Sequence, residues 1–477
     1  MRIDFLPEPE LEFGSGRHID IRFGISDYGP HDLGEDLAPR AIRVGLVGTP
    51  EHVELAREFL ERCRTEIPGA VSRQPNLRPA FPGFRPDTAF HSTLVFDDRL
   101  TRTIPARQFD DVRRDANAND FVRESVAMVV REFEYLDRNF APSVLIFAVP
   151  EQLVDLMDPD RRPSVPQGEP RLDFHDLLKA RAMRLPPVQL MLPSTADPRR
   201  ARKTKRGKTE RRIQDDATRA WNLHTALYYK ALGRPWRIPR DPNDFTTCYV
   251  GISFFHALDR SSVLTSMAQV FDERGDGVIV QGGPAEIAKD DRTPHLSADN
   301  AHAVLAEALR QYRATHGNLP ARVVIHKTSS FSAGELEGFR AAARGERIDR
   351  FDAISVADET TQRVFRYGAY PPLRGTIVAL SEREYLLYTR GSVDFYATYP
   401  GLYVPQPLLF RCEDVEQAPK QLGRQLLALS KLNWNQTQFD GSVPITIVAA
   451  RKVGSILKYA GMGGDEVKIA ARYSHYM

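Results

Sequence analysis

The chain has 477 residues, about three times the length of a typical domain, so two or three domains are expected. The 65 Lys and Arg nearly balance the 63 Asp and Glu, 42% of the residues are hydrophobic and the three cysteines stand far apart, which excludes a disordered chain, a collagen-like fibre and a disulfide scaffold. No apolar run reaches the ~18 residues of a membrane-spanning helix, and residues 1–7 lack the apolar core of a signal peptide, so we expect a soluble, cytoplasmic α/β protein without a membrane partner.

The first half of the chain predicts strands that alternate with helices. Residues 41–48 are apolar and β-branched, end in glycine and lead into a helical pattern, which is the opening of a doubly wound α/β domain. Apolar runs predict strands at 41–48, 144–149 and 189–192. Apolar residues at helical spacing predict helices at 51–63, 120–138, 172–183 and 209–232. The last helix ends before Gly233 and Pro235, a combination typical of helix C-termini.

The second half predicts a mixed sheet covered by helices. Strands are expected at 246–253, 277–281, 322–327, 353–357, 376–380, 384–389 and 444–449. Helices are expected at 298–315, 332–343, 415–429 and 453–458. The Pro- and Asp-rich residues 238–245 predict a domain boundary. We therefore expect three parts: an N-terminal segment at 1–38, a first α/β domain at 39–240 and a second at 241–477.

A strongly basic run interrupts the first domain. Residues 199–212 contain nine Lys and Arg and a single acid, Glu210. Such a run cannot be buried without a large desolvation cost, so it is exposed to solvent. Two interpretations remain open: a solubilising loop, or a contact with a polyanion.

Four polar residues in the first domain are spaced so that they could bind one phosphate group. His175 and Lys179 are four residues apart, which places them on one face of a helix. Gln189 opens the next strand, and Lys230 closes the following helix. Two cations, an imidazole and an amide supply charge-assisted hydrogen bonds to a terminal phosphate. Each also has a plainer interpretation: Lys230 could face the helix dipole, and His175 could be an ordinary half-buried histidine.

This pattern resembles the MID and PIWI domains of Argonaute proteins, and in particular the short prokaryotic Argonautes that lack the N and PAZ domains. The resemblance rests on His175, Lys179 and Gln189, followed by a helix from Asn222 to Lys230 with Trp236 after it. Residues 25–32 (ISDYGPHD) also resemble the segment that usually precedes MID. The resemblance extends from about Tyr28 to the end, and it implies a Rossmann-like MID domain followed by an RNase H-like PIWI domain with a mixed sheet.

The resemblance implies a binding site for a guide strand. In the family, residues of this pattern bind the 5′ phosphate and first nucleotide of a small guide, here His175, Lys179, Gln189 and Lys230. It also implies a structural Mg²⁺ shared by that phosphate and the terminal carboxylate, here Met477. A hard cation prefers such oxygen ligands.

Catalytic PIWI domains hold two divalent ions with acidic residues, and the resemblance places other residues at those positions here. Ser253 stands at the first acidic position, Thr328 at the second, and Ala450 at the last position, which is an Asp or His in active members. Since hydroxyl and methyl groups do not replace a carboxylate, we expect a protein that does not cleave. An active guided endonuclease with relocated acids is the alternative, and the acids considered for it are Asp259, Asp272, Asp276, Asp290 and Asp291.

The resemblance further implies a role in prokaryotic antiphage or anti-plasmid defence. A guide RNA would recognise complementary invading DNA, and this would activate a partner that carries an APAZ region fused to an effector. We favour a sirtuin-like NAD-depleting effector, with a TIR domain or a nuclease as the other candidates. A metabolic or sugar-binding α/β protein is a third interpretation, although no GxGxxG or P-loop motif supports it.

Overall fold

The computed structural model describes most of the chain. The described residues are 2–157, 165, 168–201, 213–240, 243–271, 277–280, 283–287, 293–399, 401, 404–438, 441–459 and 472–477, with the main chain alone at 266–271, 277–278 and 280. Most of the basic run lies outside them, at 202–212, as do the acids Asp272, Asp276, Asp290 and Asp291. None of the helices among the described residues combines the length and the apolar character needed to cross a membrane.

A parallel sheet forms the centre of the first half of the chain. Its strands are ordered β5 (Thr93–Val95), β4 (Ala41–Gly48), β7 (Val144–Ala148) and β8 (Val188–Met191), and β6 (Thr101–Thr103) pairs with the far end of β4. Every pairing is parallel. All residues of β7 are buried, as expected for a strand covered on both faces.

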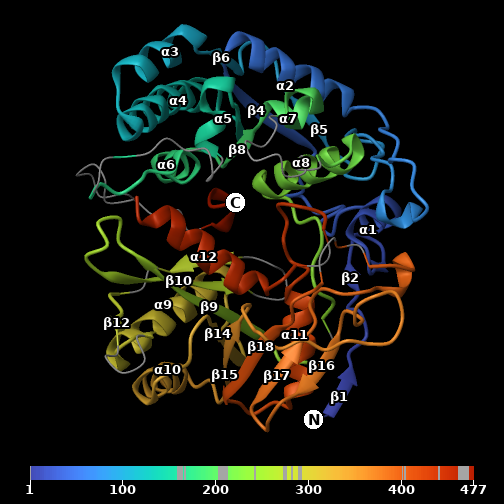
Figure 1. Cartoon of the computed structure of the whole chain (residues 1–477), viewed down its shortest axis with the longest axis vertical. Helices are drawn as coiled ribbons and strands as arrows, with labels where there is room; N and C mark the ends of the chain where they lie inside the picture. The colour runs from blue at the N-terminus through green and yellow to red at the C-terminus, as the bar shows by residue number, and fades with distance from the viewer. Residues whose placement is uncertain are drawn as a thin grey trace.

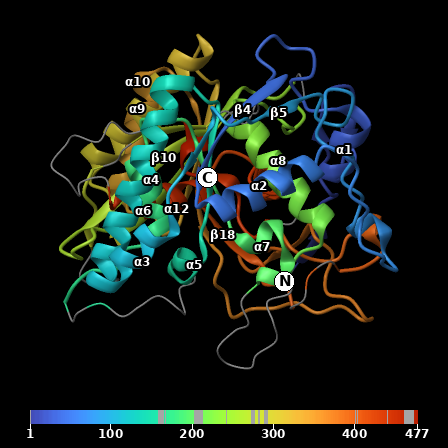
Figure 2. The ribbon, with the colours of Figure 1, turned by 90° about the horizontal axis from the view of Figure 1, so that it is seen from above.

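Helices cover both faces of this sheet, which gives the doubly wound fold that the sequence predicts. Figure 2 shows α4 and α6 on one side of β4 and α2 and α8 on the other. The start of α2 follows local rules, because Thr49 caps it and Pro50 occupies its first turn. The helices of this half are α1 (Ile21–Tyr28), α2 (Pro50–Arg62), α3 (Ala106–Asp115), α4 (Ala118–Phe140), α5 (Glu151–Met157), α6 (Phe174–Arg181), α7 (Pro193–Ala196) and α8 (Asp216–Lys230).

The second half is built on a nine-stranded mixed sheet. Its strands in spatial order are β1 (Arg2–Phe5), β16 (Thr376–Ala379), β17 (Glu384–Leu387), β18 (Leu408–Asp414), β15 (Arg350–Ala357), β14 (Arg322–Lys327), β9 (Thr247–His256), β10 (Val263–Phe271) and β11 (Gly277–Val280). β15, β14 and β9 are parallel, and the strands on either side are antiparallel. The N-terminal segment therefore contributes a strand to the sheet of the second half, at its edge beside β16 (Figure 1).

Two pairs of helices cover the nine-stranded sheet. α9 (Ala298–His316) and α10 (Ala333–Gly345) pack on one face, against Val250 and Ile252 of β9. α11 (Pro419–Leu429) packs on the other face, and Ile447 of α12 (Ile445–Leu457) joins the same core. Shorter elements complete the chain: β2 (Leu11–Glu12), β3 (Arg17–His18), β12 (Glu286–Ile287), β13 (Pro294–His295) and the 3-10 turns Pro75–Leu77, Pro198–Arg200, Asp394–Tyr396 and Tyr473–His475.

The strand expected at 444–449 is wrong, because these residues begin helix α12. The run ITIV is rich in β-branched residues, which favour strands in isolation. The helix is stabilised by packing, since α12 lies so close to β9 that a side chain on Gly251 would overlap the main-chain oxygen of Thr446. The Thr446 hydroxyl also lies 2.9 Å from Nδ1 of His326 on β14. Tertiary contacts thus override the local preference.

Other differences concern where elements begin. The structure starts the helix expected at 209–232 at Asp216, with Asp215 as its cap. The helix expected at 415–429 begins at Pro419, because β18 runs to Asp414 and proline favours the first helical turn. β1, β10 and β18 were not expected.

Helix α12 lies between the two halves of the molecule (Figure 1). One continuous hydrophobic core contains residues of β7 together with Ile445 and Val453 of α12. The indole nitrogen of Trp434 donates to the carbonyl of Trp236 at 3.2 Å, and this contact joins the second half to the segment after α8. The two halves are therefore packed together at α12.

Candidate functional site

A cavity of about 420 Å³ opens where α6, β8 and α12 meet. Its lining includes three of the four residues expected to bind phosphate, and the fourth, Lys230, hydrogen-bonds to Gln189 in its wall. We call it the cationic cavity; its lining residues are Met157, Asp173, His175, Asp176, Lys179, Gln189, Leu190, Leu192, Asn435, Lys452 and Met477. The structure thus brings together all five site residues named from the sequence.

Lys179 is held by main-chain oxygens. It lies on α6, which begins at the cap Asp173, and only 2% of it is exposed. Its ammonium donates to the carbonyl of Val188 at 2.7 Å and to the main-chain oxygen of Met477. Burial lowers the pKa of Lys179 well below its usual range, and the charges of Lys230 and Lys452 act in the same direction.

Lys230 and Gln189 form a pair. Lys230 is the last residue of α8 and is fully buried. Its ammonium donates to Gln189 Oε1 at 3.0 Å, and the amide nitrogen of Gln189 donates to the carbonyl of Leu190 at 2.9 Å. Burial lowers the pKa of Lys230 to about 7, and the charge of Lys452 contributes. Lys230 thus lies at a helix C-terminus, and its ammonium is also aimed at the amide beside the cavity.

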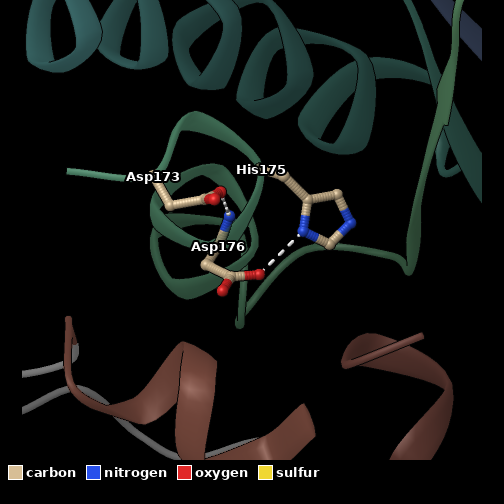
Figure 3. Close-up of side chains that lie close together, drawn as sticks. All are labelled: Asp173, His175 and Asp176. Carbon is tan, nitrogen blue, oxygen red and sulfur yellow. Dashed lines mark hydrogen bonds and ion pairs between the residues drawn. The ribbon is translucent and has the colours of Figure 1, made fainter. Parts of the chain in front are cut away.

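His175 and Asp176 meet a lysine that the sequence analysis missed. His175 Nδ1 lies 2.8 Å from Asp176 Oδ1, as the dashed line in Figure 3 marks. Lys452 of α12 donates to the same oxygen at 2.8 Å and lies 3.3 Å from His175 Nδ1. Burial lowers the pKa of His175. Burial alone would raise the pKa of Asp176, but the hydrogen bond from His175 and the charges of Lys452 and His175 keep that pKa well below its usual range. No local pattern pointed to Lys452, because the β-branched start of α12 favours a strand in isolation.

The ligand atoms of Asp173, His175 and Asp176 lie within 4.8 Å of one another, which is close enough to hold a metal ion. Their present contacts favour a different role. Asp173 Oδ1 accepts the main-chain N–H of Asp176 at 2.9 Å and caps α6, as Figure 3 shows. Asp176 accepts from Lys452, and an ammonium group at this distance disfavours a second cation. We conclude that the carboxylates position α6 and Lys452.

Met477 is buried together with the aromatic residues that precede it. It is 6% exposed, and Tyr473 and Tyr476 belong to the same hydrophobic core. Its main-chain oxygen lies beside the ammonium of Lys179 at the cavity. The final described segment is therefore docked against the site.

A second hollow, of about 250 Å³, adjoins the cationic cavity and shares Gln189, Leu190 and Asn435 with it. Asn222, part of the motif noted above, lines this adjoining hollow. Asn222 Oδ1 accepts the N–H of Thr437 at 2.8 Å, and Asn222 Nδ2 donates to Gln214 Oε1 at 3.1 Å. The other residues that line the adjoining hollow are Ser194, Thr195, Ile213, Arg219, Leu223 and Ala226. Amide and hydroxyl groups therefore extend the site away from the lysines.

The positions compared with catalytic acids lie around the carboxyl ends of β9 and β14. Ser253 is a buried residue of β9, and the N–H of Thr328 donates to the carbonyl of Ile252 at 3.1 Å. Ala450 is fully buried within α12, so it follows no strand, contrary to expectation. Asp259 is an exposed turn residue between β9 and β10 whose carboxylate accepts the N–H of Ser261 at 3.0 Å.

A buried ion pair lies next to these positions. Lys327, the last residue of β14, donates to Glu335 at 2.7 Å, and both side chains are fully buried. Glu335 also accepts the main-chain N–H groups of Leu296 at 2.7 Å and Ser332 at 2.8 Å. Its carboxylate is thus committed to a cation and to two amides inside the protein.

No protein-family model and no curated protein matches the chain. Its structure is similar to that of Clostridium butyricum Argonaute bound to a guide DNA and a 19-mer target DNA, with a TM-score of 0.65, 15% identity, and coverage of 98% of this chain and 54% of that one. Similarity to Drosophila Piwi has a TM-score of 0.60 at 14% identity, with 100% of this chain and 56% of that one covered. Similarity to A. aeolicus Argonaute has a TM-score of 0.57 at 13% identity, with 95% of this chain and 52% of that one covered.

The chain spans about half the length of these structures. Identities this low show the fold alone. The similarity extends over both halves of the chain, and so it includes the parallel sheet as well as the mixed sheet. The predicted fold class is therefore confirmed: the chain has the mixed α/β fold of the part of Argonaute and Piwi proteins that it covers.

Proposed function

We propose that the cationic cavity binds the 5′ phosphate of a guide strand, in the way the Argonaute resemblance implies. The observation that carries the proposal is that Lys179 and Lys452 line one open cavity, with Lys230 behind its wall and hydrogen-bonded to Gln189. Lys179 donates to the carbonyl of Val188 and to the main-chain oxygen of Met477. Lys230 donates to the neutral Oε1 of Gln189 and, within the described residues, forms no ion pair with an Asp or Glu side chain. A buried ammonium without a counter-ion is unfavourable, and a terminal phosphate supplies the missing negative charge.

The adjoining hollow gives the first nucleotide a place next to that phosphate. Gln189 and Asn435 line both spaces, so a phosphate in one and a nucleoside in the other are within reach of the same side chains. The amides of Gln214 and Asn222 and the hydroxyls of Ser194 and Thr195 offer both donors and acceptors to a base or sugar.

A magnesium ion is compatible with this arrangement through Met477. Its main-chain oxygen lies at the cavity, and a hard cation prefers oxygen ligands. That oxygen now accepts from the ammonium of Lys179, so the ion would bind there only once this ammonium has turned to the phosphate. Met477 would hold the ion together with a phosphate oxygen, and the ion would neutralise part of the phosphate charge. Lys179 and Lys230 would still provide direct hydrogen bonds to the phosphate.

We propose that the chain itself does not cleave. Ser253, Thr328 and Ala450 provide no carboxylate at the positions compared with catalytic acids. The carboxylate of Glu335, in the first turn of α10, is neutralised by Lys327 at the end of β14, which opposes metal binding there. The alternative of an active endonuclease predicts that the purified chain, loaded with a guide, cuts a complementary strand in Mg²⁺ or Mn²⁺.

A protein that senses without cleaving needs a partner that acts. We propose that pairing of a guide RNA with invading DNA activates an APAZ-containing effector, preferably a sirtuin-like NAD-depleting one, with TIR or nuclease effectors as the other options. Co-expression with the product of a neighbouring open reading frame, followed by NAD measurement after guide and target addition, tests this step.

Guide loading tests the phosphate site directly. Binding of a 5′-phosphorylated RNA and of its 5′-hydroxyl form is compared for the parent, Lys179→Ala and Lys230→Ala. Each substitution removes a charge-assisted hydrogen bond, so affinity for the phosphorylated strand falls about tenfold to a hundredfold. The slope of log affinity against log salt also becomes shallower by ~0.7 when one lysine no longer neutralises the phosphate.

The matched control is Lys420→Ala. Lys420 pairs with Asp4 at the N-terminal edge of the mixed sheet, at 2.9 Å, and its side chain is 43% exposed. It should bind both strands like the parent. Equal loading of phosphorylated RNA by Lys179→Ala, Lys230→Ala and the parent would show that the phosphate binds elsewhere.

A further inference from the structure

The segment after β15 displays aromatic side chains to solvent. We call residues 358–372 the aromatic loop. In it, Phe365 is 72% exposed, Tyr370 is 42% exposed and Tyr367 is fully exposed. Large aromatic side chains are normally at least half buried, so a group of exposed ones marks a binding surface.

The aromatic loop is anchored at several points. The N–H of Val364 donates to the hydroxyl of Tyr388 at 2.7 Å, and that hydroxyl donates back to the carbonyl of Val364 at 3.1 Å. The carbonyl of Thr360 accepts from Gln406 at 3.1 Å, and Arg366 Nε donates to the carbonyl of Tyr370 at 3.2 Å. The main chain is thus held while the aromatic rings remain exposed.

The charges of the loop favour a polyanion. Arg363 and Arg366 alternate with the aromatic residues, and Glu359 is the exposed acid. The other acid, Asp358, is neutralised by Arg451 through two contacts of 2.7 and 2.8 Å. Aromatic rings that stack on bases and arginines that contact phosphates are the combination that binds unpaired nucleic acid.

The loop is also connected to the cationic cavity. Asp358 is paired with Arg451 of α12, and the next residue, Lys452, lines the cavity. β15, β14 and β9 are parallel, so the loop leaves the sheet at the same edge as Thr328. Helix α12 therefore contacts both the cavity, through Lys452, and the start of the aromatic loop, through Arg451.

From these observations we propose that the aromatic loop is a second nucleic-acid contact, at which Phe365, Tyr367 and Tyr370 stack on unpaired bases of a strand whose 5′ end occupies the cationic cavity. The inference rests on the proposed guide binding and extends it with a surface for the bases. A protein partner is the other class of ligand that exposed aromatic residues attract, and the experiment below separates the two.

The test compares strands of two lengths on the full chain. The probes are 5′-phosphorylated RNAs of about 4 and about 16 nucleotides, the range of single-strand site sizes. The triple variant Phe365→Ala/Tyr367→Ala/Tyr370→Ala should bind the short RNA like the parent and the long RNA at least about tenfold more weakly, because the variant cannot stack on the bases. The matched control is Leu37→Ala/Val71→Ala, which removes two exposed apolar side chains elsewhere and should change neither affinity.

Stacking itself is followed with 2-aminopurine, whose fluorescence is quenched when it stacks. We place 2-aminopurine at successive positions of the long RNA. The parent should quench its fluorescence at one or a few positions, Tyr367→Ala should quench it less, and Tyr367→Trp should restore the quenching. If the triple variant binds both RNAs like the parent and the quenching pattern is unchanged, nucleic acid does not occupy the loop and the proposal is wrong.

Failure of the proposed function gives a different result. In that case the parent would bind the 5′-phosphorylated and 5′-hydroxyl forms of the short RNA equally, whatever the loop variants do. A length-dependent loss of affinity in the triple variant, with phosphate discrimination intact, supports both proposals.

Discussion

The lowered pKa of Lys230 predicts that the proposed guide binding depends on pH. Because burial lowers that pKa to about 7, a large fraction of the empty sites is uncharged at pH 8. A bound phosphate favours the charged ammonium, so binding at pH 8 takes up a proton, and affinity falls as the pH rises above 7. Lys179, whose pKa is lowered in the same direction, adds to the uptake.

Calorimetry measures this proton directly. At pH 8 the binding enthalpy of 5′-phosphorylated RNA should differ between buffers of different ionisation enthalpy. Lys230→Met keeps the length of the side chain and should lower the uptake by up to about one proton. A 5′-hydroxyl RNA serves as the control. A binding enthalpy that is the same in all buffers at pH 8 would show that Lys230 is already charged in the empty site.

Asp176 sets the position of a cation at the same site. It accepts from Lys452 at 2.8 Å and lies 2.8 Å from His175 Nδ1. Asp176→Asn keeps the shape but removes the charge that holds both groups. We expect phosphate affinity to fall by about tenfold to a hundredfold, since a hydrogen bond to a charged group contributes ~1.5–3 kcal/mol. Asp173→Asn keeps an acceptor for the helix cap, so its affinity for the phosphorylated strand should fall less. An equal decrease in both variants would assign the effect to α6 and not to Lys452.

Among the helices and strands, those specified by local sequence patterns could be predicted, and those specified by long-range contacts could not. α6 and α8 carry Lys179 and Lys230, and both follow from apolar spacing and caps within a few residues. The helix α12 does not, because its β-branched start becomes helical only through packing on β9. Lys452 was therefore missed. The pairing of β1 with β16 joins residues more than 370 positions apart in the sequence, and no local pattern specifies it.

The packing of α12 on β9 has a measurable consequence at Gly251. Gly251→Ala places a methyl group against the main-chain oxygen of Thr446, so α12 must shift. We expect a decrease of about 1–3 kcal/mol in the free energy of unfolding. Weaker binding of 5′-phosphorylated RNA should accompany it, because α12 carries Lys452 into the cavity.

Gly334→Ala is the matched control. Gly334 lies in α10, where an added methyl group meets no atom within 4 Å, and alanine favours a helix by ~0.5–1 kcal/mol. It should leave binding unchanged and raise stability slightly. Urea unfolding and RNA binding measure both effects. If Gly251→Ala unfolds and binds like the parent, α12 does not depend on close contact with β9.

For the whole molecule, buried histidines in both halves predict sensitivity to acid. His224 of α8 is fully buried against the rings of Phe81 and Phe84, and burial lowers its pKa to about 4. Burial lowers the pKa of His326 on β14 to about 3, and Arg322 adds to the shift. Both are neutral in the folded chain at pH values where an unfolded histidine, with a pKa near 6.5, takes up a proton. The unfolded state therefore binds more protons at these histidines below about pH 6.5, so their contribution to stability is constant above that value and falls as the pH decreases.

The size of the effect follows from the shift. For His224 the difference between about 6.5 and about 4 corresponds to about 3 kcal/mol, lost progressively between those two pH values. His224→Phe fits among aromatic neighbours and removes the titration, so its unfolding free energy should fall less steeply than that of the parent between pH 6.5 and 4 in urea titrations. His302→Gln, at an exposed position on α9, should leave the profile unchanged. The prediction is wrong if the unfolding free energies of the parent and of His224→Phe fall in parallel with pH. In that case α8 opens, and exposes His224, before the rest of the fold, and the two halves unfold separately in acid.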